Sequence, residues 1–251
     1  MDLGISGRRA AVAAASAGLG LACARALATE GARVALCGRR PERVEAAVAN
    51  LRAAGGDAVG LVADVSDAEG GGAFVDRAIE ALGGVDILVT NAGGPPPGTF
   101  ASTDLAHYSS ALELNLLSTV AMCKAAVPAM AERGWGRVVA ITSMTVRQPS
   151  PTLILSNTAR TGATAFLKTL ASEVAPQGVT VNSVQPGLHA TDRLAQLYGG
   201  DLSAAAATVP VRRIGEPDDF GATVAFLCSE QARFITGTAL SIDGGAYAGL
   251  M

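Results

Sequence analysis

The sequence predicts an α/β fold in which a doubly wound parallel sheet carries helices on both faces. Short runs rich in β-branched residues alternate with alanine-rich stretches along the whole 251-residue chain. In the alanine-rich stretches, apolar residues recur every three to four positions, which is typical of helices. A glycine-containing turn follows the first predicted strand and opens the first predicted helix. Strand–helix alternation at this spacing indicates βαβ units and a parallel sheet.

The apolar, β-branched runs predict the strands of a seven-stranded sheet, at Arg9–Ala13, Arg33–Leu36, Ala58–Val62, Asp86–Thr90, Arg137–Thr142, Thr180–Val184 and Ala239–Ile242. The recurrence of apolar residues predicts helices between them, at Gly20–Thr29, Pro41–Ala53, Asp67–Leu82, Asp104–Ala131 and Thr158–Ala175. The chain contains neither an internal repeat nor a low-complexity linker, and Pro95-Pro96-Pro97 is interpreted as a rigid loop. We therefore expect residues 1–251 to form a single domain.

Composition excludes several classes of protein. Hydrophobic residues make up 49% of the chain, but many are alanines, and no apolar run approaches the roughly 18 to 20 residues of a membrane span. The N-terminus lacks the basic and apolar regions of a secretory signal. A net charge of −3 without a basic cluster argues against a nucleic-acid partner. We expect a cytoplasmic protein with neither membrane nor nucleic acid as partner.

The cysteines give no sign of a metal site. Cys23, Cys37, Cys123 and Cys228 are scattered, form no Cys-x-x-Cys pair and have no histidine at zinc-ligand spacing. We expect reduced, mostly buried thiols and no bound metal.

The turn after the first predicted strand is a candidate phosphate loop. It spans Ala13–Gly20, with the sequence AAASAGLG. Glycines in such a turn let the backbone approach a pyrophosphate, which rests on the first N–H groups of the following helix. The strand before and the helix after supply the context that this motif requires. Ser16, Gly18, Leu19 and Gly20 are therefore candidate cofactor-binding residues.

This turn resembles the TGxxxGxG loop of short-chain dehydrogenases/reductases, with Ala13 and Ala14 in place of the threonine and the first glycine. The methyl group that Ala14 adds at the turn would loosen dinucleotide binding, and it does not forbid this binding unless the position needs a positive φ. Asp64-Val65 resembles the family's aspartate that contacts the adenine ring. Asn91-Ala92-Gly93 resembles the motif that supports the central sheet and flanks the adenosine.

Later segments extend the resemblance in the right order. Pro186-Gly187 with Thr191 resembles the element that lines the nicotinamide, and Arg213–Pro217 and Gly237–Gly245 resemble the C-terminal signature. The resemblance implies a Rossmann-type doubly wound sheet, an oxidoreductase activity and a homotetramer or homodimer. It covers about 240 residues of the chain.

The end of the second predicted strand indicates the preferred nucleotide. An acidic residue there would accept hydrogen bonds from both ribose hydroxyls and repel a 2′-phosphate. This chain has Gly38 at that position, followed by Arg39 and Arg40. Because an arginine fork pairs well with a phosphate dianion, NADP(H) is favoured over NAD(H). The alternative is that the two arginines are only a solvated loop pair.

The catalytic positions depart from the family pattern. The family sets a serine thirteen residues before a tyrosine acid and a lysine four residues after that tyrosine. Ser143 matches the serine, but Ser156 stands at the tyrosine position and Arg160 at the lysine position. Asn115 matches the helix asparagine that anchors a water of the proton relay. The chain is similar to an atypical 3-oxoacyl-ACP reductase-like subgroup that lacks a perfect tetrad.

The two replacements change what the site can do. Ser156 cannot replace a phenol directly, because an alkanol is a far weaker acid than a group of pKa about 10. Arg160 is always charged and cannot relay a proton. It can hold a ribose hydroxyl and place a fixed positive charge near a developing oxyanion.

Three functions remain open. In the favoured one the protein transfers hydride to a carbonyl or conjugated enone, with the proton from substrate or from water held by Asn115, Ser143 and Ser156. In the second it is a nucleotide-binding pseudoenzyme or regulatory subunit without turnover. The third is non-redox chemistry, as in the halohydrin dehalogenases. Those relatives also have arginine at the lysine position, but they keep the tyrosine and lose the glycine loop. This chain lacks the tyrosine and keeps the glycine loop.

Further residues have two interpretations each. His189 is a candidate replacement acid or a hydrogen-bonded loop imidazole. Arg147 could clamp an anionic substrate or be solvated, and Tyr108 and Tyr198 could be phenol donors or packing residues. The segment Thr191–Thr208, rich in small residues, is interpreted as a mobile substrate lid.

Overall fold

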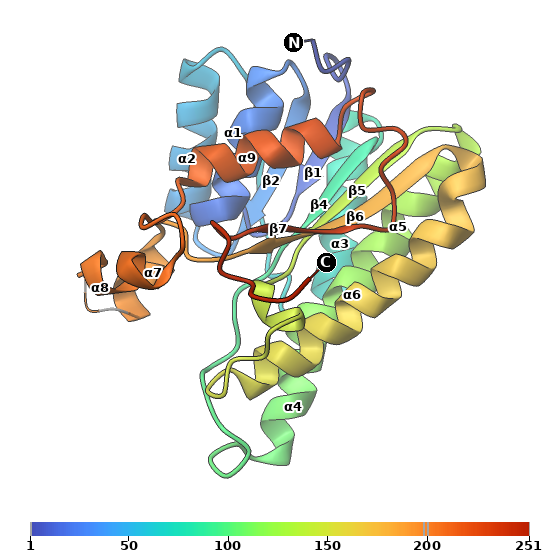
Figure 1. The fold of residues 1–251 in the computed structure, drawn as a ribbon. Coiled ribbons are helices and arrows are strands. Elements are labelled where there is room, and N and C mark those ends of the chain that lie inside the picture. Colours follow the sequence, from blue (N-terminus) through green and yellow to red (C-terminus); the bar gives the residue numbers. More distant parts are fainter. Residues whose placement is uncertain (1, 198, 200, 251) are drawn as a thin grey trace.

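The computed structural model describes residues 2–197, 199 and 201–250. Seven parallel strands in this part of the chain form a sheet in the order β3-β2-β1-β4-β5-β6-β7 (Figure 1). The strand order reverses between β1 and β4, and the carboxyl ends of strands at such a switch point form a ligand crevice. The strands are β1 (Arg9–Val12), β2 (Arg33–Gly38), β3 (Asp57–Val62), β4 (Ile87–Thr90), β5 (Gly136–Ile141), β6 (Val179–Pro186) and β7 (Ala239–Ile242).

Helices cover both faces of the sheet (Figure 1). On one face lie α1 (Gly18–Thr29), α2 (Pro41–Ala53) and α9 (Pro217–Leu227). On the other lie α3 (Ala68–Leu82), α5 (Ser118–Glu132) and α6 (Ile154–Val174). The remaining elements are α4 (Leu105–Leu112), the π turn η1 (Glu113–Leu117), the 3₁₀ turns η2 (Met144–Val146) and η3 (Ala175–Gln177), and the short helices α7 (Asp192–Leu197) and α8 (Ser203–Thr208).

Burial on both faces explains the composition of the central strands. Every residue of β4 and β5 is buried, so these strands are nearly continuous apolar runs instead of alternating ones. Local signals fix the helix ends. Asp67 caps α3 by accepting a hydrogen bond from the backbone N–H of Gly70, and Gly83 ends the helix in the left-handed conformation. Pro41 opens α2, where its missing N–H costs nothing.

The predicted fold class and the seven strands are confirmed, with each strand end within two residues of its predicted place. Two helix predictions need correction, and α9 was missed. The segment predicted as Asp104–Ala131 is interrupted by the π turn, and α6 begins at Ile154 instead of Thr158. We did not predict α9, although Pro217 with Asp218 and Asp219 in its first turn is a helix-start signal.

The stretch Leu105–Glu132 is long and apolar enough, by length and composition, to cross a membrane. It contains no uninterrupted apolar run of that length, because polar and charged residues such as Glu113 and Lys124 divide it. In the fold, 44% of its most apolar window is buried. Met122, Ala126 and Met130 of α5 pack into the core between the sheet and α3. Packing inside the fold therefore accounts for much of its apolar character.

Candidate functional site

One cleft at the carboxyl ends of β1 to β4 is lined by six of the cofactor candidates from the first half of the chain, namely Ser16, Arg39, Arg40, Asp64, Val65 and Gly93. The cleft has a volume of about 360 Å³. It is lined by the phosphate loop, the end of β2, the end of β3 and the loop after β4. The lining residues are Ala14, Ser16, Ala17, Gly38, Arg39, Arg40, Ala63, Asp64, Val65, Ser66, Gly93, Gly94 and Leu114.

The backbone of the phosphate loop can approach an anion closely. A Cβ atom on Gly20 would lie 2.7 Å from the carbonyl oxygen of Ala14 and 2.9 Å from Nδ2 of Asn91, so only glycine lets α1 start here. Gly18 has a φ of 58°. Ala17, at the N-cap of α1, provides no side-chain hydrogen bond to the helix. The first N–H groups of α1 are therefore available to an anion.

Ala14 occupies a strained position in this loop. Its φ is 47°, in the left-handed region that costs a residue with a Cβ about 1–2 kcal/mol. Its N–H donates to Sγ of the buried Cys37 at 3.3 Å, and its carbonyl accepts from Nδ2 of Asn91 at 3.2 Å. The position therefore does need a positive φ. Alanine in place of the family's first glycine has a definite conformational cost.

The end of β2 presents two arginines to the cleft. Arg39 and Arg40 are exposed on its rim, and neither side chain forms a hydrogen bond or ion pair with any residue that the structure describes. At Gly38, a Cβ atom would lie 2.5 Å from Oγ of Ser16. Ser16 thus leaves no room for an acidic side chain at position 38. The two guanidinium groups therefore dominate the local charge.

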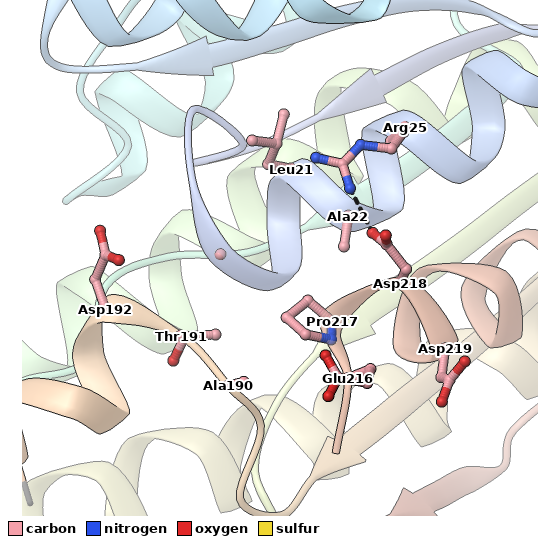
Figure 2. A pocket seen from close by; sticks show the side chains of 11 residues that line it. Leu21, Ala22, Arg25, Ala190, Thr191, Asp192, Glu216, Pro217, Asp218 and Asp219 are labelled. Carbon is pink, nitrogen blue, oxygen red and sulfur yellow. Dashed lines mark hydrogen bonds and ion pairs between the residues drawn. The ribbon is translucent and has the colours of Figure 1, made fainter. Parts of the chain in front are cut away.

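A second hollow of about 450 Å³ lies beside the phosphate loop (Figure 2). Gly18 lines it from α1, and Thr191 lines it from the segment after β6. An Arg25–Asp218 ion pair joins α1 to α9 at its edge (Figure 2). Oγ1 of Thr191 accepts a hydrogen bond from the N–H of Leu194 and so caps α7. The predicted pyrophosphate and nicotinamide elements therefore face one another across this hollow.

Pro186 and Gly187 end β6 and lead to this segment. A Cβ atom on Gly187 would lie 2.7 Å from the Cα of Asp243, so β6 and the end of β7 can approach closely only with glycine here. This contact joins two motifs of the C-terminal half that are far apart in the sequence.

The side chain of Arg160 connects α6 to the end of β5 and to the loop after β4. Its buried guanidinium donates to the carbonyl oxygens of Ile141 at 3.0 Å and Thr142 at 3.3 Å, at the end of β5. It also donates to those of Ala92 at 3.5 Å and Gly93 at 3.3 Å, in the loop after β4. The side chain therefore fixes the strand ends that flank the catalytic candidates.

Asn115 lies in the π turn, a feature frequent at functional sites. Its Nδ2 donates to the carbonyl oxygen of Gly93 at 2.9 Å, the same oxygen that Arg160 contacts. Its Oδ1 is buried and has no partner among the residues that the structure describes. An unsatisfied buried acceptor is costly, so this oxygen marks a place for a donor such as water.

The two serines differ in their surroundings. Ser143 follows β5, and its Oγ accepts hydrogen bonds from the N–H of Thr145 at 3.2 Å and from Oγ1 of Thr145 at 3.0 Å. Ser156 is half-buried in the first turn of α6 and makes no side-chain hydrogen bond to the described part of the chain. It lies one helical turn before Arg160, on the same side of the helix. Thr145 was not among the predicted site residues, although a hydroxyl two residues after a serine is a signal for a local turn.

Comparison with known proteins agrees with this geometry. A family model described as "Enoyl-(Acyl carrier protein) reductase" matches residues 13–247. Human dehydrogenase/reductase SDR family member 4 is 36% identical over 244 residues, covering 96% of this chain and 88% of that protein. The chain belongs to the short-chain dehydrogenase/reductase family.

Further relatives of this short-chain dehydrogenase/reductase are also described as reductases. Acetoacetyl-CoA reductase of Cupriavidus necator is 35% identical over 243 residues, covering 96% of this chain and 99% of that protein. L-sorbose reductase of Gluconobacter frateurii, in complex with NADPH and L-sorbose, has a TM-score of 0.93 at 33% identity, with both chains fully covered. A 3-oxoacyl-(acyl-carrier-protein) reductase of Agrobacterium tumefaciens with NADP bound has a TM-score of 0.92 at 33% identity, covering 97% and 95%. The chain is an oxidoreductase of this family.

His189 lies in a different environment from the other candidates. Its ring packs edge-on against Phe220 at 5.2 Å, and Nδ1 lies 3.3 Å from the carbonyl oxygen of Gly187. Burial lowers its pKa, so the imidazole is neutral near pH 7. It lines a separate pocket of about 170 Å³ with Arg213 and Asp219. These surroundings favour the loop-imidazole interpretation over the replacement acid.

Arg147 and Tyr108 are also held by structural contacts. Arg147 donates to the carbonyl oxygen of Ala239 at 2.8 Å and lies over the ring of Tyr247. Tyr108 packs against a small apolar cluster that includes Leu155. Tyr198 lies outside the described residues. The predicted lid contains α7 and α8.

Proposed function

We propose that this protein is an NADP(H)-dependent oxidoreductase that reduces either a carbonyl, such as that of a 3-oxoacyl compound, or a conjugated enone. The observation that supports it best is the pair of guanidinium groups, without partners in the described part of the chain, beside the uncapped start of α1. Together they suit a dinucleotide that carries a 2′-phosphate. Two relatives of known structure bind NADPH or NADP.

Different residues of the chain would bind different parts of the dinucleotide. The phosphate loop would hold the pyrophosphate, and Arg39 and Arg40 the 2′-phosphate. Asp64 and Val65 would contact the adenine. The remaining cofactor residues would be Ser16, Gly18, Leu19, Gly20, Asn91, Ala92, Gly93, Arg160, Pro186, Gly187 and Thr191. When bound, the nicotinamide supplies or accepts the hydride.

The catalytic residues would act on the carbonyl without a phenol. Ser143 would donate a hydrogen bond to the substrate oxygen, and the buried charge of Arg160 would favour negative charge nearby. Asn115 and Ser156 would hold a water, since both have unpaired polar atoms among the described residues. Conjugate reduction suits this site, because an enolate can be protonated later by solvent.

Two further proposals rest on the family resemblance. We propose that residues 1–251 act as one nucleotide-binding domain and assemble into a homotetramer or homodimer. We also propose a cytoplasmic protein that acts on a small molecule, with no nucleic-acid or membrane partner.

A specific observation favours a second candidate function, nucleotide binding without turnover. The Arg160 guanidinium donates to four backbone carbonyls, as a purely structural side chain would. The two functions differ in the rate measured with NADPH and a panel of simple ketones, 3-oxoacyl thioesters and cyclic enones. Nucleotide binding without turnover of any of them would favour the second function.

The double variant Ser156→Tyr/Arg160→Lys refines this test. It restores the family's phenol and lysine, so it should raise the rate on simple ketones. If the native protein turns over a substrate and the double variant does not, the serine–arginine pair is itself the catalytic arrangement.

Nucleotide preference is tested by calorimetric titration. We expect NADPH to bind more tightly than NADH. Arg39→Glu should weaken NADPH binding about 10- to 100-fold, because it removes a charge-assisted hydrogen bond and adds repulsion. Arg233→Glu is the matched control, since Arg233 is exposed close to Arg137 at the start of β5, away from the cleft, and the charge change is equal. An unchanged NADPH-to-NADH ratio in Arg39→Glu would show that Arg39 does not contact the 2′-phosphate.

A further inference from the structure

The hydroxyl group of Ser143 is held by one neighbouring residue. Thr145, only 8% exposed, donates to it twice, from the backbone N–H at 3.2 Å and from Oγ1 at 3.0 Å. A serine hydroxyl has two acceptor lone pairs and one proton. With both lone pairs occupied by Thr145, the remaining hydrogen-bonding capacity of Ser143 is the proton.

We propose that Thr145 is a positioning residue that fixes Ser143 as a hydrogen-bond donor to the substrate oxygen. Within the described residues, the Ser143 hydroxyl donates to no acceptor. Its proton is therefore available to a bound substrate. This inference rests on the proposed reduction of a carbonyl or enone.

The backbone around Ser143 is fixed from two sides. Arg160 donates to the carbonyl oxygens of Ile141 and Thr142, the two residues that precede Ser143. On the other side, the N–H of Val146 donates to the Ser143 carbonyl oxygen at 3.2 Å. The hydroxyl oxygen thus stands on a rigid backbone, and Thr145 sets its rotation. Preorganised donors of this kind stabilise an oxyanion without reorganisation during the reaction.

The absence of a phenol makes this donor more important. With serine at position 156, no strong acid stands at the family's proton-donor position. A site that stabilises the oxyanion by hydrogen bonding instead suits substrates whose negative charge is delocalised. Hydride addition to a conjugated enone gives a delocalised enolate, whereas addition to a simple ketone or to the 3-oxo group of an acyl thioester gives a localised alkoxide. The Thr145–Ser143 pair therefore suits conjugated enones best.

The test compares Thr145→Val, which keeps the shape and loses the hydroxyl, with Thr145→Ser, which keeps the hydroxyl. The substrates are 2-cyclohexenone and acetoacetyl-CoA, each with NADPH. Thr145→Val should lower kcat about tenfold, less than the roughly 10²–10³ of losing a donor outright, because Ser143 itself remains. NADPH affinity should change by less than about twofold, because the Thr145 hydroxyl faces Ser143. Thr145→Ser should restore most of kcat.

Thr180→Val is the matched control. Thr180 is also a buried threonine, but it lies on β6 near the amino ends of the strands, where the register pairs it with Arg137 of β5. This variant should keep the wild-type kcat. Thr145→Ala repeats the hydroxyl deletion if the valine variant does not fold.

The outcomes separate the two proposals. Turnover by the wild type that Thr145→Val or Thr145→Ala retains would overturn the role of Thr145 alone. Equal losses in Thr145→Ser and Thr145→Val would do the same, because a lost methyl contact would then explain the effect. No turnover by the wild type on either substrate, with NADPH bound, would overturn the proposed reduction together with this inference.

Discussion

Ala14 holds a backbone torsion angle that favours glycine. Its φ of 47° lies in the left-handed region, at the tight turn between β1 and α1. Two hydrogen bonds to Cys37 and Asn91 hold the turn in this shape. The rest of the fold therefore imposes the conformation at a cost that alanine does not avoid.

Ala14→Gly should raise the free energy of unfolding by about 0.5–1 kcal/mol. Relief of about 1–2 kcal/mol of left-handed strain outweighs the roughly 0.4–1 kcal/mol that glycine adds in unfolded-state entropy. Urea denaturation at pH 7 measures the change. Ala15→Gly is the control, because Ala15 is fully buried with an ordinary φ, and its loss should destabilise the protein. A lower midpoint for Ala14→Gly would contradict the strain argument.

At the scale of elements, one buried carboxylate joins the amino ends of β1 and β4. Asp86 accepts hydrogen bonds from the backbone N–H of Arg9 at 3.0 Å and from its Nε and Nη2 at 2.8 and 2.6 Å. Arg133, after α5, lies 3.4 Å away. Burial by itself would raise the pKa of Asp86, but the hydrogen bonds from Arg9 and the two positive charges hold this pKa below its usual value.

Asp86→Asn should lower the free energy of unfolding at pH 7 by about 2–3 kcal/mol, because it weakens charged hydrogen bonds at a buried site. A lowered folded-state pKa contributes stability above the usual pKa of about 4, and this stability is lost as pH falls through the folded-state pKa. The variant should therefore show a flatter pH dependence below about pH 5. Denaturation series from pH 7 to pH 3 measure both effects.

Asp57→Asn provides the comparison for this prediction. Asp57 pairs with Arg33 at the start of β3, but its side chain is 65% exposed. Exposed ion pairs contribute only about 0–1 kcal/mol. Equal effects of the two substitutions would show that the burial of Asp86 is not decisive.

Across the whole molecule, the thiols confirm the expectation of free, buried cysteines. Cys23 and Cys228 lie in the core on the α1 and α9 side of the sheet, and Cys37 and Cys123 on the other side. Burial raises the pKa of Cys37, Cys123 and Cys228 to about 12, and it raises the pKa of Cys23 as well. Thiolate, the reactive form, is therefore scarce in the folded protein.

Ellman's reagent at pH 8 should label almost no thiol in the native protein within minutes. In guanidinium chloride all 4 cysteines should react, because unfolding restores their ordinary pKa and access. NADPH should slow any residual labelling by stabilising the folded state. Rapid native labelling of even one thiol would show that part of the core opens readily.

Local sequence was enough to predict the strands, most helices and their order, because periodicity and turn chemistry act over a few residues. Apolar, β-branched runs predicted the seven strands, and the phosphate-loop pattern placed Gly18 and Gly20 at the start of α1. The pattern did not reveal the π turn at Asn115, which interrupts an otherwise continuous helical periodicity. The early start of α6 was also missed.

Contacts between distant residues became visible only in the folded chain. The crowding of Gly38 by Ser16, the four carbonyl contacts of Arg160 and the seclusion of His189 beside Phe220 all join segments far apart in the sequence. The left-handed angle of Ala14 is held by hydrogen bonds to Cys37 and Asn91, which are also distant in the sequence. Residue types name the groups that can donate, accept or carry charge, but packing alone fixes which of them meet.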